Sequence, residues 1–175
     1  MPRRVASTRS VVTPAAENDI RARLGGHDLD FTALSAVSNI YRAGSAVRNH
    51  MERTVLGTVQ LSWVGFTVLW VLWIWGERET GHLAAEAGVS KGTLTGVLRT
   101  LQSRDLIERR THLDDRRRVS VRLTRSGERL IATVFPEFNR HEALAVATLS
   151  SAEQRVLARL LRRVQHHLDD LEAPH

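Results

Sequence analysis

Apolar residues recur at helical spacing in two long segments of the chain. The first begins at Thr32, the expected N-cap, and its face comprises Val37, Ile40, Gly44, Val47, Met51 and Val55. The second follows Ser150 and Glu153, which have the spacing of a capping box, and its face comprises Val156, Leu157, Leu160, Leu161, Val164, Leu168 and Leu171. These faces offer more apolar surface than one small lobe can bury, so we expect a homodimer.

An uncharged segment between these helices predicts a buried helix. Residues 63–74 contain no charged side chain, Ser62 precedes them as an expected N-cap, and Gly76 follows them as the expected end. The apolar run is about 13 residues long, whereas roughly 20 are needed to span a bilayer. The segment therefore indicates a core helix, and we expect no membrane partner.

A helix-turn-helix pattern comes next. Residues 80–87 predict a short helix, Gly88 supplies a turn, and Ser90 caps a further helix with core positions Leu94, Val97, Leu98 and Leu101. The opposite face is small and polar. It contains Gly92 and Gly96, each of which lowers helix propensity by about 1 kcal/mol. Either this face approaches a DNA groove closely, or it is an ordinary exposed face.

The residues after this pair predict a β-hairpin. Apolar and polar side chains alternate as in a half-buried strand, with Val119, Val121 and Leu123 against Arg118, Ser120 and Arg122. Residues 106–110 can pair with this strand, and the charged link 112–117 would project as a wing. Seven arginines gather there: Arg109, Arg110, Arg116, Arg117, Arg118, Arg122 and Arg125. Such density favours an anionic partner, although a solvated charged hairpin is the alternative.

A further helix should follow Thr124, its expected N-cap, with Pro136 expected to bend or divide it. The elements together predict a mainly α fold, a winged helix-turn-helix with a two-stranded β wing. We divide the chain into a flexible basic N-terminal arm with a short helix near residues 17–24, a dimerisation helix, a DNA-binding lobe and C-terminal dimerisation helices, over residues 1–28, 29–60, 61–124 and 125–175.

Composition limits which partners the protein can bind and which site chemistry it can use. The formal net charge is +6 and Lys91 is the only lysine, so guanidinium groups carry the positive charge. This favours nucleic acid or an acidic membrane surface, unless it only reflects genome composition. The chain has no cysteine, which excludes disulfides and thiolate ligands. The adjacent His166 and His167 would point about 100° apart on a helix, so we expect no metal and no cofactor.

The sequence contains no signal-like segment, so we expect a cytoplasmic protein. It also contains no phosphate loop, nucleophile elbow or zinc-protease helix, so we expect that the protein is not an enzyme.

The central motifs resemble one bacterial family. Residues 61–127 contain Leu61-Ser62, Phe66, Leu83-Ala84, Val89-Ser90, Thr93, Leu101, Leu106, Asp115-Arg116-Arg117 and Leu123-Thr124, and end at Gly127. An Asp-x-Arg wing followed by Leu-Thr-x-x-Gly resembles the multiple antibiotic resistance regulator (MarR) family. The resemblance implies a homodimer on a pseudo-palindromic operator in double-stranded DNA. It also implies a repressor relieved by a small aromatic or anionic effector, without catalysis.

The expected DNA contacts come from the second helix of the pair and from the wing: Ser90, Lys91, Thr93, Thr95, Arg99, Arg110, Asp115, Arg116, Arg117 and Arg118. Threonines suit phosphates or thymine methyl groups, and Arg99 suits guanine. The resemblance places Arg117 in a minor groove beside Asp115. Relatives often carry a longer residue at Gly96, so Lys91 and Thr95 become the better candidates for base contacts.

The aromatic residues of the uncharged helix allow a ligand site. Trp63, Phe66, Trp70 and Trp73 share one face, while Trp75 lies elsewhere. Such a stripe ordinarily fills core space. The resemblance places an effector cleft between the dimerisation helices and the DNA-binding lobe, where this stripe would line it. Arg48 or His50 would then meet an anion, or both are ordinary surface residues.

These features predict a sequence-specific transcription regulator. The alternative is an architectural or protein-partner module that uses the same fold without sequence-specific operator binding.

Overall fold

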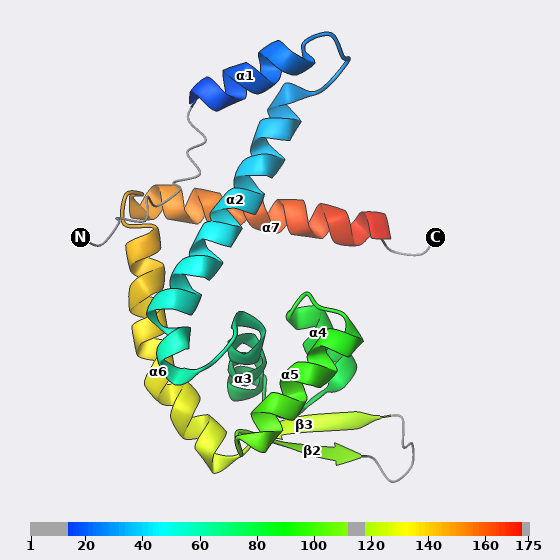
Figure 1. Cartoon of the computed structure of the whole chain (residues 1–175), viewed down its shortest axis with the longest axis vertical. Coiled ribbons are helices and arrows are strands. Elements are labelled where there is room, and N and C mark those ends of the chain that lie inside the picture. Colours follow the sequence, from blue (N-terminus) through cyan, green and yellow to red (C-terminus); the bar gives the residue numbers. More distant parts are fainter. Residues whose placement is uncertain (1–13, 112–117, 173–175) are drawn as a thin grey trace, which may run out of the picture. The chain divides into compact units, whose positions relative to one another are not determined.

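The computed structural model describes residues 14–111 and 118–172. The chain forms two compact units, Met1–Ala46 and Val47–His175. Helix α2 (Phe31–Thr54) begins in the first unit and ends in the second (Figure 1). The functional boundaries suggested by the sequence at 60/61 and 124/125 both fall inside the second unit.

The first unit contains α1 (Pro14–Leu24) and most of α2. Helix α1 lies in the segment expected to be a flexible arm, and it begins before the short helix anticipated near residues 17–24. The Asp30 carboxylate accepts a hydrogen bond from the Ala33 backbone N–H at 2.9 Å. Asp30 therefore caps α2, and the expectation that Thr32 is the N-cap is wrong, because Thr32 already lies within the helix.

The second unit is built around α3 (Trp63–Trp75), which follows a 3₁₀ turn, η1 (Leu56–Val59). The Ser62 hydroxyl accepts a hydrogen bond from the Gly65 backbone N–H at 3.1 Å, and Gly76 ends the helix with a φ of 74°. Both ends agree with the sequence pattern. Six of the 13 residues of α3 are buried, whereas the side chains of its last turn, Trp73, Ile74 and Trp75, are exposed.

A three-stranded antiparallel sheet stands beside the short helices α4 (Thr80–Glu86) and α5 (Lys91–Ser103). Its strands are β1 (Arg78–Glu79), β2 (Ile107–Thr111) and β3 (Val119–Leu123), in the order β1-β3-β2. The hairpin was expected from the sequence, whereas β1 was not. Two residues are too short a strand to show any alternation.

Helix α6 (Arg125–Ala145) begins at Thr124, whose hydroxyl accepts a hydrogen bond from the Gly127 N–H. The helix continues through Pro136, so of the two effects expected from the sequence, a bend or a division, the division does not occur. Ile131, Val134 and Phe138 are buried on both sides of the proline, and α6 packs along α3. This packing stabilises the helix across the one backbone hydrogen bond that proline cannot make.

Helix α7 (Ser151–Glu172) has the predicted capping box. The Glu153 carboxylate accepts from the Ser150 N–H at 2.7 Å, and the Ser150 hydroxyl accepts from the Glu153 N–H. Hydrogen bonds from Ser150 lower the pKa of the Glu153 carboxyl. No residue of α7 is buried in the single chain, and six of the seven residues of its apolar face, all but Leu161, are 42% to 65% exposed. No helix in the described part is both long and apolar enough to cross a membrane.

Candidate nucleic-acid interface

Helices α4 and α5 form the predicted helix-turn-helix (Figure 1). Gly88 has a φ of 60°, a conformation that favours glycine, and the Val89 N–H donates to the Ala84 carbonyl at 3.0 Å. Leu83 and Ala84 of α4 are buried with Leu94 and Leu98 of α5. The core of the second unit therefore fixes which face of α5 is turned outward.

The outward face of α5 carries the side chains expected to contact DNA. Lys91, Thr93, Thr95 and Arg99 are exposed, as is the N-cap Ser90. The Ser90 hydroxyl accepts from the Thr93 N–H at 3.2 Å, so this residue is first of all a helix cap. Thr95 donates its hydroxyl proton to the Lys91 carbonyl at 2.8 Å, so its hydroxyl oxygen can still accept a hydrogen bond.

Position 96 is open to solvent. A Cβ built on Gly96 would meet no heavy atom within 4 Å. No contact with the described residues therefore requires glycine at this point of α5. Its smallness leaves space beside the helix for another molecule.

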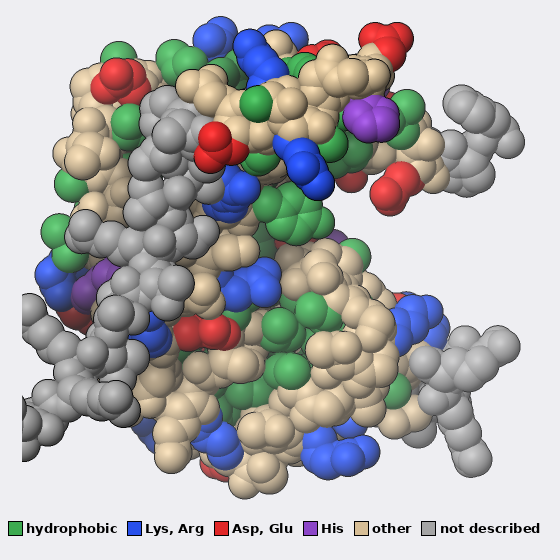
Figure 2. Space-filling model, turned by 45° about the horizontal axis from the view of Figure 1, so that its top comes forward, with side chains coloured by type: hydrophobic (Ala, Val, Ile, Leu, Met, Phe, Trp, Pro, Cys, Tyr) green, Lys and Arg blue, Asp and Glu red, His purple; other side chains and the backbone are tan. Residues whose placement is uncertain are grey.

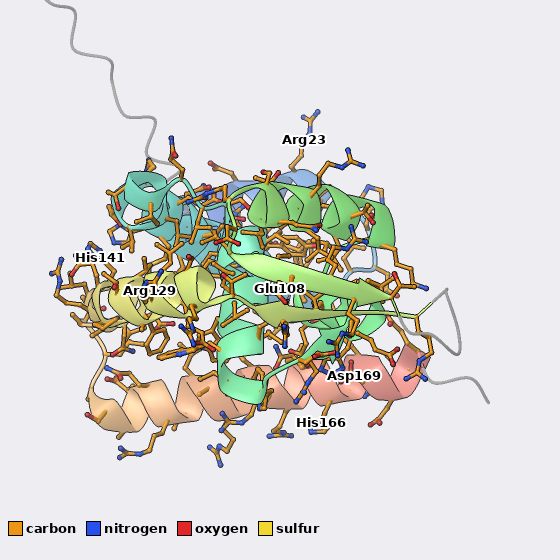
Figure 3. All side chains as sticks on the ribbon, turned by 90° about the horizontal axis from the view of Figure 1, so that it is seen from below. Arg23, Glu108, Arg129, His141, His166 and Asp169 are labelled. Atoms are coloured by element: carbon orange, nitrogen blue, oxygen red, sulfur yellow. The ribbon has the colours of Figure 1, made fainter. Side chains whose placement is uncertain are left out.

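The register of the three strands places a group of polar side chains on one face of the sheet. Ser120 of β3 pairs with Glu79 on one side and with Arg110 on the other, while Arg122 pairs with Glu108. Paired residues and alternate residues along a strand share a face, so these side chains lie together with Arg118. Figure 3, which shows the sheet in front, labels Glu108 on it.

Carboxylates hold two of the wing arginines. Glu79 Oε1 accepts from Arg118 Nε at 3.0 Å and also from its Nη2. Glu108 Oε2 accepts from Arg122 Nε at 2.9 Å and Nη2 at 2.6 Å, and this hydrogen bonding raises the pKa of Arg122. The expectation of a dense cluster of unpaired guanidinium groups is therefore corrected at Arg118 and Arg122, because carboxylates on neighbouring strands bind them.

Arg109 and Arg110 of β2 are exposed and make no ion pair within the described ranges 14–111 and 118–172. Asp115, Arg116 and Arg117, expected at the wing, lie outside the described residues. On the face shown in Figure 2, Lys and Arg side chains are scattered among uncharged ones and do not form a continuous patch. The described wing therefore offers individual cationic contacts.

Ser120 is buried despite its polar position in the alternating pattern, with 3% of its surface exposed. Its hydroxyl donates to the carboxylate of Glu77, which precedes β1. Glu77 and Glu79 were not among the residues expected from the sequence. The alternation Glu77-Arg78-Glu79 before the helix-turn-helix was the available signal.

Arg104, at the C-terminal end of α5, was also missed. Its guanidinium donates to the Val59 carbonyl at 2.9 Å and to the Gln60 carbonyl at 2.6 Å. Gln60 has a φ of 52°, so the arginine binds the backbone just where it turns into α3. An open hollow of about 460 Å³ lies beside this contact, between α3 and α5, and Thr93, Gly96 and Thr100 form one side of it.

Three of the four aromatic residues expected to share one face of α3 lie against rings of α6. Phe66 is buried and stacks on Phe138 at 4.0 Å between ring centres, and Trp63 lies 6.0 Å from the same ring. Trp70 meets Trp75 edge to face at 5.1 Å, so Trp75, expected to lie elsewhere on the helix, contacts one ring of this group. The fifth ring, Trp73, lies against Phe135.

Arg48 and His50, the expected anion contacts, already have partners within the chain. The Arg48 guanidinium lies over the Trp63 ring at 5.8 Å, and His50 Nε2 lies 2.8 Å from His141 Nδ1. His141 Nε2 lies 3.2 Å from the Glu137 carboxylate. The hollow beside α5 includes none of the six residues expected to bind an effector. The described residues contain no cluster of three metal-ligating side chains.

Comparisons with known proteins agree with this geometry. The MarR family model matches residues 61–119. The uncharacterised helix-turn-helix transcriptional regulator YwaE of Bacillus subtilis (strain 168) is 37% identical over 140 residues, which cover 80% of this chain and 82% of YwaE.

Two solved structures show the same fold. BpsR of Bordetella bronchiseptica is 24% identical, with a TM-score of 0.70, over 75% of this chain and 98% of its own. AbsC of Streptomyces coelicolor is 19% identical, with a TM-score of 0.72, over 82% and 99%.

Proposed function

This chain belongs to the MarR family, and from that membership we propose that it is a homodimeric repressor that binds a specific operator and releases it when a small aromatic or anionic ligand binds. The family assignment itself makes the chain a transcriptional regulator and not an enzyme.

One observation supports the proposal that the protein binds DNA in a sequence-specific manner. The exposed face of α5 contains hydroxyls, Lys91 and Arg99 but no carboxylate, and it is presented by a helix-turn-helix with strands directly behind it. A helix of this kind fits a major groove, where arginine contacts guanine and threonine contacts thymine methyl groups. The open position at Gly96 allows close approach of DNA to the helix.

The wing would supply the flanking contacts. Arg110, which has no carboxylate partner among the described residues, suits a phosphate. Asp115, Arg116 and Arg117 remain proposed contacts on the family resemblance, with Arg117 in the minor groove. Phosphate contacts fix the position of the protein, and base contacts give it specificity.

The dimer is proposed from α7. Its apolar side chains, including Leu160, Val164 and Leu168, are unburied in the single chain, and a second copy would cover them. Two equivalent reading helices then require half-sites about 10 base pairs apart, or a multiple of that spacing.

The effector is proposed as a small aromatic anion. BpsR is described as having its DNA binding regulated by 6-hydroxynicotinic acid, which is such a molecule. In this chain the half-buried indoles and the Arg48 guanidinium over Trp63 provide matching chemistry, with His50 nearby on α2. The ligand would act by favouring a dimer in which the two reading helices are misplaced on the operator.

The test begins by sequencing the DNA fragments that the purified protein retains. Affinity is then measured for the retained sequence and for random DNA. We expect a specificity ratio of about 10³ or more. Lys91→Ala and Arg99→Ala should lower operator affinity, whereas Arg159→Ala, an exposed arginine on α7, should not. Equal binding of both DNAs would support the alternative, an architectural or protein-partner module.

A further inference from the structure

Arg104, at the C-cap position of α5, joins this helix to the segment that leads into α3. Its Nη1 donates to the Gln60 carbonyl at 2.6 Å, and its Nη2 donates to the Val59 carbonyl at 2.9 Å. Two nitrogens of one planar guanidinium thus bind two successive carbonyl groups, a geometry that the single ammonium group of lysine does not reproduce. The partners are 44 and 45 residues away in the sequence, so the contact fixes α5 to a separate part of the fold.

The two carbonyl groups lie at the C-terminal end of the 3₁₀ turn η1. The last carbonyl groups of a helix lack partners within it, and an arginine side chain can hydrogen-bond them. Gln60 has left-handed backbone angles, with φ at 52° and ψ at 42°, and Ser62, the cap of α3, follows two residues later. Arg104 therefore caps η1 from another helix and ties α5 to the start of α3.

Apolar packing supports one side of α5 and leaves another side open. Leu94, Leu98 and Leu101 are buried in the core of the second unit. Beside them lies the open hollow of about 460 Å³ between α5 and the start of α3, a space that apolar side chains do not fill. Arg104 and Gln60 both line this hollow, so their hydrogen bond joins its two sides.

The orientation of α5 matters because base contacts tolerate little displacement. The helix has 13 residues and is about 20 Å long, so a tilt of about 6° around its middle moves each end by about 1 Å. A shift of that size breaks a direct hydrogen bond to a base edge, whereas binding to random DNA relies on phosphate contacts made by long, flexible side chains. A change in the tilt of α5 should therefore weaken operator binding more than binding to random DNA.

We propose that Arg104 is a positioning residue for DNA reading, because it holds α5 at the angle that brings Lys91, Thr95 and Arg99 to the base edges. This inference rests on the proposed operator-binding function. It assigns no contact with DNA to Arg104 itself, which acts through the orientation of α5.

The test compares wild type, Arg104→Lys and Arg104→Met on operator and random DNA at several salt concentrations. Arg104→Lys keeps the charge but not the two-carbonyl geometry, so the operator-to-random affinity ratio should fall about 3-fold or more. Arg104→Met keeps only the aliphatic stem, and the ratio should fall about 10-fold, as for the loss of one good base contact. Partial unfolding lowers both affinities by the same factor, so this ratio reports the orientation of α5 and not the stability of the protein.

The matched controls are Arg140→Lys and Arg140→Met, because the Arg140 guanidinium binds Glu137 within the same helix, α6. Both controls should leave the ratio unchanged. Circular dichroism selects a temperature at which every variant is folded.

A wild-type ratio for Arg104→Lys would overturn the inference, since a cation alone would then suffice at this position. An equal loss of affinity for both DNAs in Arg104→Met, with a shallower salt dependence, would overturn it too, because Arg104 would then be a phosphate contact. If wild type does not distinguish operator from random DNA, the proposed function fails instead.

Discussion

The Cα of Gly127 faces the carbonyl oxygen of Leu106 so closely that a Cβ at position 127 would lie 2.0 Å from that oxygen. The same oxygen accepts a hydrogen bond from the Thr124 N–H at 3.1 Å. Thr124 uses its hydroxyl twice, accepting from the Gly127 N–H and donating to the Asp105 carbonyl. The Leu-Thr-x-x-Gly motif therefore joins the end of β3 and the start of α6 to the turn before β2.

Gly127→Ala should destabilise the protein strongly, by about 3 kcal/mol or more, because the obstructing atom belongs to the backbone and cannot rotate away. Urea unfolding at fixed protein concentration measures the loss. Gly96→Ala is the matched control, since a Cβ there meets nothing and alanine favours a helix by about 1 kcal/mol. Equal unfolding midpoints for the two variants would contradict this account.

Ser90 combines a structural and a proposed DNA-binding role, and two substitutions separate them. Ser90→Ala removes the cap on the Thr93 N–H and should cost about 1 kcal/mol of stability. Ser90→Asp keeps a capping oxygen, so stability should be retained while repulsion from phosphates weakens DNA binding. Thermal unfolding and DNA titration measure the two effects. Ser90→Asp bound as tightly as wild type would place residue 90 away from DNA.

Leu160→Glu should dissociate the dimer, because it places a charge in the middle of the exposed apolar face of α7. Light scattering at micromolar concentration should then report a monomer. Arg159→Glu introduces the same side chain one residue away, outside that face, and should leave the dimer intact. A wild-type monomer, or a dimer that survives Leu160→Glu, would rule out α7 as the interface.

The pKa of Glu137 is lowered from 4.5 to about 2, first by the hydrogen bond from Arg140 and then by its Coulombic attraction and by His141. Because the folded state binds this proton less well than the unfolded chain, the contribution is present above pH 4.5 and is lost as the pH falls toward 2. The pair is exposed, so the effect should be small.

The difference in unfolding free energy between wild type and Glu137→Gln should therefore shrink between pH 4.5 and 2. Replacing Arg140 by alanine should remove most of that pH dependence. A difference that is constant over this range would show that the carboxylate gains nothing from its neighbours.

Local patterns in the sequence were enough to define most of the helices and the wing. Ser62, Ser90, Thr124 and Ser150 cap their helices as predicted, since a cap depends only on residues within one turn. The small polar face of α5 likewise follows from helical periodicity, because burial of Leu94 and Leu98 leaves the opposite side outward.

Tertiary structure decided which contacts join segments that are distant from one another in the sequence. The sequence places Arg118 in a basic cluster, but the register of β1 against β3 brings Glu79 to it from 39 residues away. In the same way, His141 meets His50 across 91 residues. The requirement for glycine at 127 arises from the carbonyl of Leu106, in the turn before β2. Periodicity reports which face of an element is apolar, whereas the partner of each polar side chain is fixed only when separate elements pack together.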